Sequence, residues 1–346
     1  MTAQALYEKM KARLAHVVPD VELRYKAELA EQILRLKEER NAVILAHNYM
    51  EPALYYSVPD FTGDSLELSR KAAQTDKDVI VFCGVRFMAE TAKILNPGKT
   101  VLLPAERAGC SLAESITAED VRTLKRAFPG VPVVSYVNTY ADVKAETDVC
   151  CTSGNAAAVV NSIGSERIIF LPDEFLARNV ARETGRKIFF PTRKALREGT
   201  VEVPPGTGLI GWHGSCEVHE RFTVEDVVNA RRQFPDVVVL AHPECKPAVV
   251  RAADFAGSTM AMVREVQRSD ARRYLLLTEC SMADNIAAEN PGKEMVRMCS
   301  LRCPHMNEIT LEDTLKALQL NRYVVDVPED IRVRALRSVE RMIAIG

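Results

Sequence analysis

Three cysteines of this chain share a spacing that marks them as candidate metal ligands. Cys110, Cys216 and Cys303 are each followed seven residues later by Thr-x-Glu-Asp, and no other cysteine of the nine has this continuation. Three thiolates can hold a zinc ion with water as the fourth ligand, or three irons of a 4Fe-4S cluster whose fourth iron stays open. Catalytic zinc sites usually include histidine, so thiolates from three distant segments favour the cluster.

The remaining cysteines carry weaker signals. A single cysteine is more often a buried structural thiol than a ligand, and the surroundings of Cys83 are typical of a core position. Cys150 and Cys151 could either line a site or pack in the interior. Cys299 could form a reversible disulfide with Cys303, although three residues separate the pair instead of the two of the thioredoxin motif.

Polar side chains that can transfer protons follow three similar hydrophobic segments. AVILAH ends at His47, VVSY ends at Tyr136 and VVVLAH ends at His242, each after an amphipathic helical pattern. Because equivalent strands end at equivalent places, we expect these ends to meet in one polar pocket for a small molecule. The predicted pocket residues at the strand ends are His47, Tyr49, Tyr136, Asn138, His242 and Glu244.

Hydroxyl side chains open the helical segment that follows each of these strands. The residues concerned are Ser65, Ser153, Ser258 and Thr259. They could serve as helix caps only, or they could help the helix N-termini to bind a phosphate or carboxylate. His213 and His219 flank Cys216, where a histidine could join the thiolate on zinc, support a cluster or contact the product.

Short hydrophobic strands alternate with helical patterns along the chain, which predicts an α/β fold with parallel sheets. The cysteine repeat divides it into three similar units at residues 1–116, 117–222 and 223–309. We expect three α/β/α units in a triangle around a pseudo-threefold axis, with helices in 310–346 packed back on the first unit. Ligands bind at the carboxyl ends of such strands, so the three cysteines would meet at one central active site.

The composition is that of an ordinary globular chain with a sizeable core. Of the 346 residues 47% are hydrophobic, and 45 basic residues nearly balance 47 acidic ones. Without a basic run or a basic helix face, nucleic acid and anionic membranes are poor partners. The longest apolar stretches have the length of a strand, and the N-terminal pattern is that of a charged helix. We therefore expect no membrane span and a cytoplasmic protein.

Taken together, these segments resemble the quinolinate synthase family. The matching motifs, in order between about residues 40 and 320, are AHNYMEP, DFTGDSLELS, AGCSLAESI, VVSYVNT, CTSGNA, GWHGSC, AHPEC, AGSTM and RCPHMNEITLE. The resemblance implies three similar domains in a triangle and a 4Fe-4S cluster, with one open iron, on Cys110, Cys216 and Cys303. It also implies that substrate contacts His47, Ser65, Tyr136, Asn138, Ser153, His242, Glu244 and Thr259.

Members of this family condense iminoaspartate with dihydroxyacetone phosphate, with loss of phosphate and water, in NAD biosynthesis. A mechanism consistent with the residues and the resemblance makes Glu244 a general acid or base helped by His242. It assigns proton transfers to His47 and Tyr49. An aspartate oxidase or dehydrogenase would supply the unstable iminoaspartate. Some members carry CxxCxxC around the last ligand, and this chain has Cys299-x3-Cys303 instead, which puts a redox role of the extra cysteine in doubt.

Two other functions stay open at the level of the sequence. Another 4Fe-4S hydro-lyase acting on a hydroxy acid would use the same open iron but would need no phosphate site. A non-catalytic iron-sulfur sensor or electron carrier would instead need four cysteine ligands and a surface for its partner. The acid-base groups at three strand ends argue against this second alternative.

Overall fold

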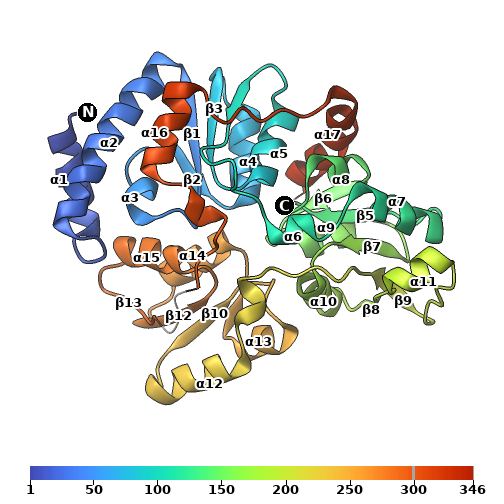
Figure 1. Cartoon of the computed structure of the whole chain (residues 1–346). Helices are drawn as coiled ribbons and strands as arrows, with labels where there is room; N and C mark the ends of the chain where they lie inside the picture. The colour runs from blue at the N-terminus through green and yellow to red at the C-terminus, as the bar shows by residue number, and fades with distance from the viewer. Residues whose placement is uncertain (298–300, 346) are drawn as a thin grey trace.

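The structure is a computed structural model that describes residues 1–297 and 301–345. Three parallel sheets covered by helices confirm the predicted α/β class. The three units lie at the corners of a triangle (Figure 1). Within the described residues, no helix combines the length and apolar character that crossing a bilayer requires. Cys299 lies outside the described residues, so its pairing with Cys303 stays a prediction.

The first sheet has the strand order β2-β1-β3-β4, and all of its strands are parallel. Its central strand β1 is buried along its whole length, as expected for a strand covered on both faces. The elements of this unit are α1 (Ala3–Leu14), α2 (Asp20–Glu39), β1 (Ala42–His47), α3 (Pro52–Tyr55), β2 (Phe61–Gly63), α4 (Ser65–Gln74), β3 (Val79–Cys83), α5 (Arg86–Leu95), β4 (Thr100–Leu102) and α6 (Ser111–Glu114).

The second sheet has five strands in the order β6-β5-β7-β9-β8, again all parallel. Its first four positions repeat the first sheet, and β8 extends its far edge. The elements are α7 (Ala118–Ala127), β5 (Val133–Tyr136), α8 (Ala141–Ala145), β6 (Val149–Cys151), α9 (Ala156–Ser162), β7 (Ile168–Leu171), α10 (Glu174–Glu183), β8 (Lys187–Phe189), α11 (Arg193–Glu198) and β9 (Thr207–Ile210).

The third sheet, β11-β10-β12-β13, returns to four parallel strands in the order of the first. A short 3₁₀ turn, η1 (His219–Arg221), precedes this unit and a second, η2 (Met306–Glu308), follows it. The other elements are α12 (Val224–Gln233), β10 (Val238–Ala241), α13 (Pro247–Ala252), β11 (Phe255–Ala256), α14 (Thr259–Arg268), β12 (Arg273–Leu277), α15 (Cys280–Glu289) and β13 (Glu294–Met295).

An aspartate before the edge strand joins that strand to the central strand in the same way in every sheet. The carboxylates of Asp60, Asp148 and Asp254 accept backbone N–H groups of the central strands at 2.8, 2.7 and 2.8 Å. The backbone N–H of each aspartate donates back to the carbonyl of the same strand residue. This shared pair of hydrogen bonds supports the threefold repeat, and the three aspartates were not predicted from the sequence.

Helix caps explain the repeated Thr-x-Glu-Asp pattern. Thr117, Thr223 and Thr310 stand immediately before α7, α12 and α16 (Leu311–Leu320). Each hydroxyl accepts the backbone N–H of the aspartate three residues later, which satisfies a free donor of the first turn. In α7 and α12 the aspartate also accepts the threonine N–H, which completes a capping box. The repeat therefore marks the start of equivalent helices.

The C-terminal helices bridge two units. α16 packs on α2 of the first unit. α17 (Glu329–Ala344) packs mainly on α8 and β6 of the second unit and also contacts α4 and α5 of the first. Figure 1 places α16 beside α2 and α17 above α8. Of the segment 310–346, which we expected on the first unit, α16 thus contacts the first unit and α17 contacts both the first and the second.

Candidate functional site

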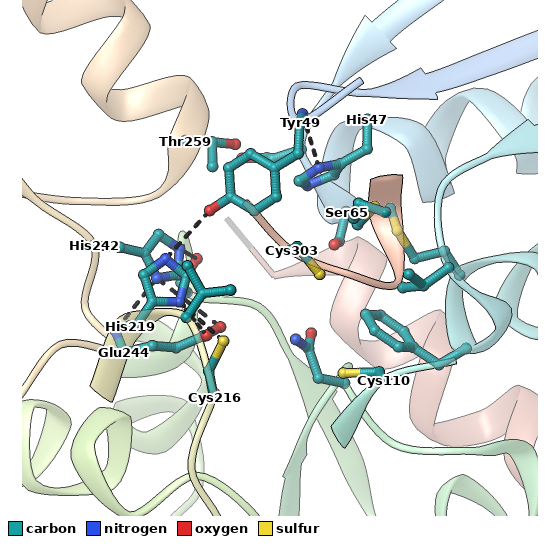
Figure 2. Close-up of a pocket in the computed structure, with 18 of the residues that line it drawn as sticks. His47, Tyr49, Ser65, Cys110, Cys216, His219, His242, Glu244, Thr259 and Cys303 are labelled. Atoms are coloured by element: carbon teal, nitrogen blue, oxygen red, sulfur yellow. Dashed lines mark hydrogen bonds and ion pairs between the residues drawn. The ribbon is translucent and has the colours of Figure 1, made fainter. Parts of the chain in front are cut away.

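The three units meet at one pocket, and nearly all of the predicted site residues line it. Figure 2 shows them converging from the three units. The predicted residues in the wall are His47, Tyr49, Ser65, Cys110, Tyr136, Asn138, Ser153, Cys216, His219, His242, Glu244, Thr259 and Cys303. Ser258 does not line the pocket, because its hydroxyl turns to the side chain of Asp64.

The three repeated cysteines bring their thiols to this pocket from three connecting segments (Figure 2). All three are partly exposed, whereas Cys83, Cys150, Cys151 and Cys245 are fully buried. Each precedes a short helical turn, α6, η1 or η2, and the backbone N–H groups two and three positions after the cysteine lie near its sulfur. Such N–H groups stabilise thiolate, as helix N-termini do.

Burial opposes this stabilisation of the thiolates. It raises the pKa of Cys110 to about 12 and that of Cys303 to about 11, although the nearby backbone N–H groups act to lower both. Thiolates that are shielded from most of the solvent need a compensating positive charge, which a bound metal provides. The donor set is therefore suited to a metal centre.

The segment that carries Cys216 is held closely against the second unit. Gly214 pairs with Asp173 in a parallel bridge, and its N–H donates to the carbonyl of Pro172 at 3.0 Å. A Cβ on Gly214 would lie 2.4 Å from the Ser115 hydroxyl and 2.6 Å from the Pro172 carbonyl. No larger residue fits there without a shift, so glycine allows this segment to approach β7.

Glu244 is the centre of a buried hydrogen-bonded cluster. It is 2% exposed, accepts the Tyr136 hydroxyl at 2.5 Å and lies 2.8 Å from Nδ1 of His219. Burial acts to raise the pKa of Glu244, but the adjacent His219 and the hydrogen bonds from His219 and Tyr136 outweigh burial and lower it. Glu244 is therefore an ionised carboxylate inside the pocket.

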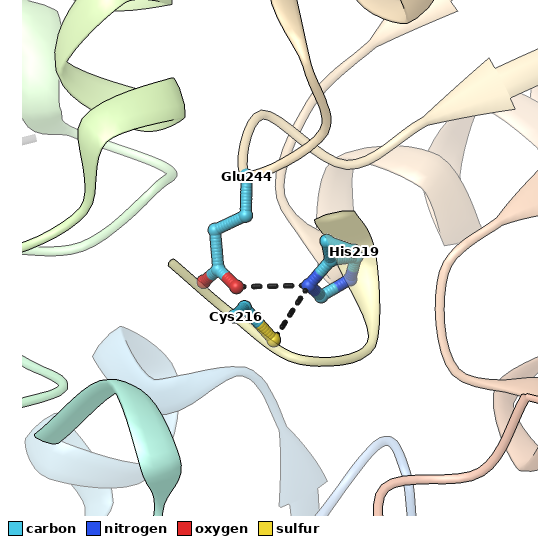
Figure 3. Close-up of side chains that lie close together, drawn as sticks. All are labelled: Cys216, His219 and Glu244. Carbon is cyan, nitrogen blue, oxygen red and sulfur yellow. Dashed lines mark hydrogen bonds and ion pairs between the residues drawn. The ribbon is translucent and has the colours of Figure 1, made fainter. Parts of the chain in front are cut away.

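Nδ1 of His219 also lies 3.2 Å from the sulfur of Cys216 (Figure 3). Among the described residues, Cys216, His219 and Glu244 form a group whose ligand atoms lie within 4.8 Å of one another, so the three could hold a metal ion. From the sequence, a histidine beside Cys216 could bind zinc, support a cluster or contact the product. His213 does not reach the pocket, because its ring turns to Glu174 at 2.6 Å on the surface.

His47 and His242 occupy equivalent positions and have the same tautomer. Nδ1 of each ring accepts the backbone N–H two residues later, at 3.3 Å in both. Each neutral ring therefore carries its proton on Nε2, and that of His242 lies 3.3 Å from the Ser153 hydroxyl. Burial lowers the pKa of His47 to about 4, and burial with the adjacent His219 lowers that of His242 to about 3. Both are neutral donors near pH 7.

Helices α4 and α14 direct their N-termini to the pocket, but not every predicted hydroxyl residue caps its helix. Asp64, and not Ser65, caps α4 by accepting the N–H groups of Leu66 and Glu67. Ser258 does cap α14. Ser153 precedes α9 but does not cap it, since Asn155 is the N-cap residue. The hydroxyls of Ser65 and Ser153 are consequently not used as caps.

Other wall residues were not predicted as site residues. They are Asp64, Val85, Gly109, Thr152, Val218 and Met306; Phe87 and Met88 also line the pocket. Phe87 and Met88 belong to GVRFMAE, whose apolar residues could equally have belonged to the core. Behind the wall, Thr278 follows β12 directly, and Asp173 follows β7 after Pro172. A polar residue just after a buried strand is a recognisable signal in the sequence, but the predicted site residues came from only one strand end in each unit.

A triangle of parallel α/β units around a buried, cysteine-lined polar pocket defines the class as an α/β protein with one central candidate active site. The chain belongs to the family described as quinolinate synthetase A protein, whose model matches residues 31–344.

Curated relatives cover nearly the whole chain. It is 54% identical over 333 residues to quinolinate synthase 2 of Mesorhizobium japonicum, with 96% of each chain covered. It is 52% identical over 345 residues to quinolinate synthase of Agrobacterium fabrum, and this alignment covers 100% of this chain and 92% of the relative. Quinolinate synthase of Xylella fastidiosa is 54% identical over 315 residues, and this alignment covers 91% of this chain and 86% of the relative. The chain is thus a member of an enzyme family.

Proposed function

We propose that this chain is a quinolinate synthase that condenses iminoaspartate with dihydroxyacetone phosphate, with loss of phosphate and water, in NAD biosynthesis. The observation that carries the proposal is the presence of three cysteine thiols and the Glu244–His219 pair in one pocket. The names of the family and its relatives support quinolinate as the product. The substrates are those implied by the resemblance of the motifs.

The thiol set fits a 4Fe-4S cluster held by Cys110, Cys216 and Cys303. All three thiols come from separate segments, and they are partly exposed at the same pocket. When bound, such a cluster supplies an open iron that acts as a Lewis acid towards a hydroxyl or carboxylate. Zinc on Cys216, His219 and Glu244 is the competing assignment, because these ligand atoms lie close enough together for a metal ion.

The polar residues of the wall divide into acid-base groups and groups that orient the substrate. Glu244 is ionised and buried, so it suits a general base that later returns the proton as an acid. His47 and His242 present Nε2–H donors to substrate oxygens. Tyr136 holds the carboxylate of Glu244. The remaining predicted contacts with the substrate, Ser65, Asn138, Ser153 and Thr259, are neutral donors and acceptors in the same wall.

Both proposed substrates are negatively charged, so the pocket must supply positive potential to bind them. The N-termini of α4 and α14 contribute positive potential towards it, which favours the phosphate and carboxylate groups.

Iminoaspartate is unstable, so we propose that an aspartate oxidase or dehydrogenase supplies it. The proposed location is the cytoplasm, where reducing conditions keep thiols such as Cys110 and Cys216 free for a metal.

The test is to purify the chain without oxygen and to measure iron content, Mössbauer spectra and quinolinate formation from the two substrates. The same measurements are made on Cys110→Ala, Cys216→Ala and Cys303→Ala. Cys83→Ala is the matched control, because this buried cysteine lies outside the pocket wall. We expect a four-iron cluster and quinolinate in the wild type and in the control, and neither in the three other variants.

The outcomes separate the alternatives. A protein that contains zinc and no iron, and that loses its zinc in Cys216→Ala but keeps it in Cys110→Ala, would support the zinc assignment. An iron-loaded wild type that forms no quinolinate would disprove the proposed reaction. Activity without a phosphorylated substrate would favour the hydro-lyase alternative.

A further inference from the structure

One buried amide holds the backbone on both sides of Glu244. Nδ2 of Asn179 donates to the carbonyl of Pro243 at 2.8 Å and to that of Cys245 at 3.0 Å. Because carbonyls only accept, the amide must face them with its NH₂ group. Both carbonyls lie beyond the end of β10, outside its paired residues. Asn179 therefore fixes the turn from which the Glu244 side chain projects.

The same pair of hydrogen bonds occurs at the equivalent residue of the first unit, Tyr49. Nδ2 of Asn285 donates to the carbonyls of Asn48 and Met50, at 3.1 and 2.9 Å. Asn179 and Asn285 are each the sixth residue after the N-cap of their helices, α10 and α15. Their Oδ1 atoms are both buried and have no hydrogen-bond partner in the part of the chain that the structure describes. The position and the direction of the amide are thus shared.

In the second unit a lysine makes the equivalent contacts. Thr91, the sixth residue after the N-cap of α5, donates its hydroxyl to a carbonyl of its own helix. Nζ of Lys144, which is fully buried, donates instead to the carbonyls of Val137 and Thr139. These two carbonyls flank Asn138. Three side-chain nitrogens from three helices thus bind the carbonyls on both sides of equivalent pocket residues.

The second unit holds Glu244 at both ends. Asn179 binds the backbone around it, and the Tyr136 hydroxyl donates to its carboxylate at 2.5 Å. Helix α10, which carries Asn179, packs on α13, which begins soon after Glu244. A shift of the turn would move the carboxylate away from its partners. Because proton transfer requires hydrogen-bond distance, such a shift would lower the rate while the acid-base group is still present.

We propose that Asn179 is a positioning residue for the reaction, which fixes Glu244 through the two carbonyls that flank it. The inference rests on the proposed function, in which Glu244 takes and returns a proton. Asn179 does not line the pocket, so it acts only through the turn that carries Glu244. Loss of its amide leaves two carbonyls without a donor, so the turn relaxes and the carboxylate loses its fixed place.

The test compares Asn179→Leu, which has a similar size but no donor, with Val180→Ala, a buried position in the same helix. Both are measured as the full chain with its cofactor loaded, by initial rates, iron content, thermal unfolding and hydrogen exchange of the Glu244 and Cys245 amides. We expect Asn179→Leu to lower kcat about 10- to 100-fold, up to the cost of a misplacement of about 1 Å. KM and iron content should stay nearly unchanged, and the two amides should exchange faster. Val180→Ala should lower thermal stability but leave kcat and exchange unchanged.

A double variant tests whether Asn179 acts through Glu244. Adding Asn179→Leu to Glu244→Gln should lower kcat no further, whereas a general structural role would multiply the two losses. Multiplying losses, wild-type kcat or unchanged amide exchange in Asn179→Leu would each overturn the inference.

A second variant keeps the test decisive if Asn179→Leu does not fold. Asn179→Ser retains one donor and should give an intermediate loss of kcat and intermediate exchange, and wild-type values for both would overturn the inference. The exchange measurement does not depend on the reaction. An iron-loaded wild type that makes no quinolinate would disprove the proposed function, while faster exchange in Asn179→Leu would still support the hold of Asn179 on the turn.

Discussion

At the scale of single residues, Glu244 combines a buried negative charge with two strong donors, Tyr136 and His219. Glu244→Gln keeps the size of the side chain but removes both the charge and the ability to take a proton. We expect quinolinate formation to fall about 10²- to 10⁴-fold, the usual range for lost acid-base catalysis, with iron content unchanged. Initial rates and iron analysis measure this. Glu225→Gln, an exposed position in α12, is the control. Full activity of Glu244→Gln would remove Glu244 from the mechanism.

A second prediction at this scale concerns acid stability and His47. Its folded pKa is about 4, against about 6.5 in an unfolded chain. Between these values the unfolded chain binds a proton that the folded chain does not, so stability falls as the pH decreases from 6.5 towards 4. The loss from this residue reaches about 1.4 kcal/mol per pH unit.

Urea unfolding of wild type and His47→Gln between pH 4.5 and 6 measures this effect. The stability of His47→Gln should depend less steeply on pH, because glutamine does not titrate. Equal slopes for the two proteins would mean that the folded chain protonates His47 as readily as the unfolded chain does.

At the scale of elements, the short turns after the cysteines and the segments before them position the thiols. In the segment that leads to Cys216, a Cβ on Gly214 would meet Ser115 and the backbone carbonyl of Pro172. We expect Gly214→Ala to lower the free energy of unfolding by about 1–3 kcal/mol and to reduce iron content, because the segment must move away from β7.

Thermal unfolding and iron analysis check this prediction, with Gly164→Ala as the matched control. A Cβ at Gly164 meets nothing within 4 Å, and its backbone is not left-handed. Gly164→Ala should leave both quantities nearly unchanged. If Gly214→Ala behaved in the same way, the close approach of this segment to β7 would not be needed to place Cys216.

At the scale of the whole molecule, hydrogen bonds between side chains of different units converge on the pocket. The pairs are Tyr49–Thr278, Asn48–Thr259 and Asp64–Ser258 between the first and third units, and Tyr136–Glu244 between the second and third. The buried face of α17 adds a connection between the first and second units. Docking of the units and formation of the site are therefore the same event.

α17 provides the prediction at this scale. Met342 is fully buried on its inner face, and its carbonyl accepts the side chain of Asn155, the N-cap of α9. Met342→Ala should lower the free energy of unfolding by about 2–5 kcal/mol, because it leaves a cavity on the buried face of α17. Thermal unfolding measures the loss. Arg337→Ala, an exposed position in the same helix, should stay within about 0.5 kcal/mol of wild type. Equal effects of the two changes would contradict this role of α17.

The sequence by itself determined the strands, the repeated helix starts and the candidate ligands. These depend on local physics: Thr117 and Thr223 cap helices through bonds that span three residues. Buried parallel strands are recognisable as short apolar runs such as that ending at His47. The fold class followed from these signals without knowledge of any distant contact.

Only the tertiary structure decided which polar groups meet. Glu244 and Tyr136 are 108 residues apart, and Thr278 reaches Tyr49 across 229 residues, so no local pattern pairs them. Ser258 stands at the start of a helix, as its sequence predicts, but its side chain does not line the pocket. Its local position was therefore predictable, and the direction of its side chain was not. Such contacts depend on how three sheets dock, and docking is set by the sum of many packing contacts along each face.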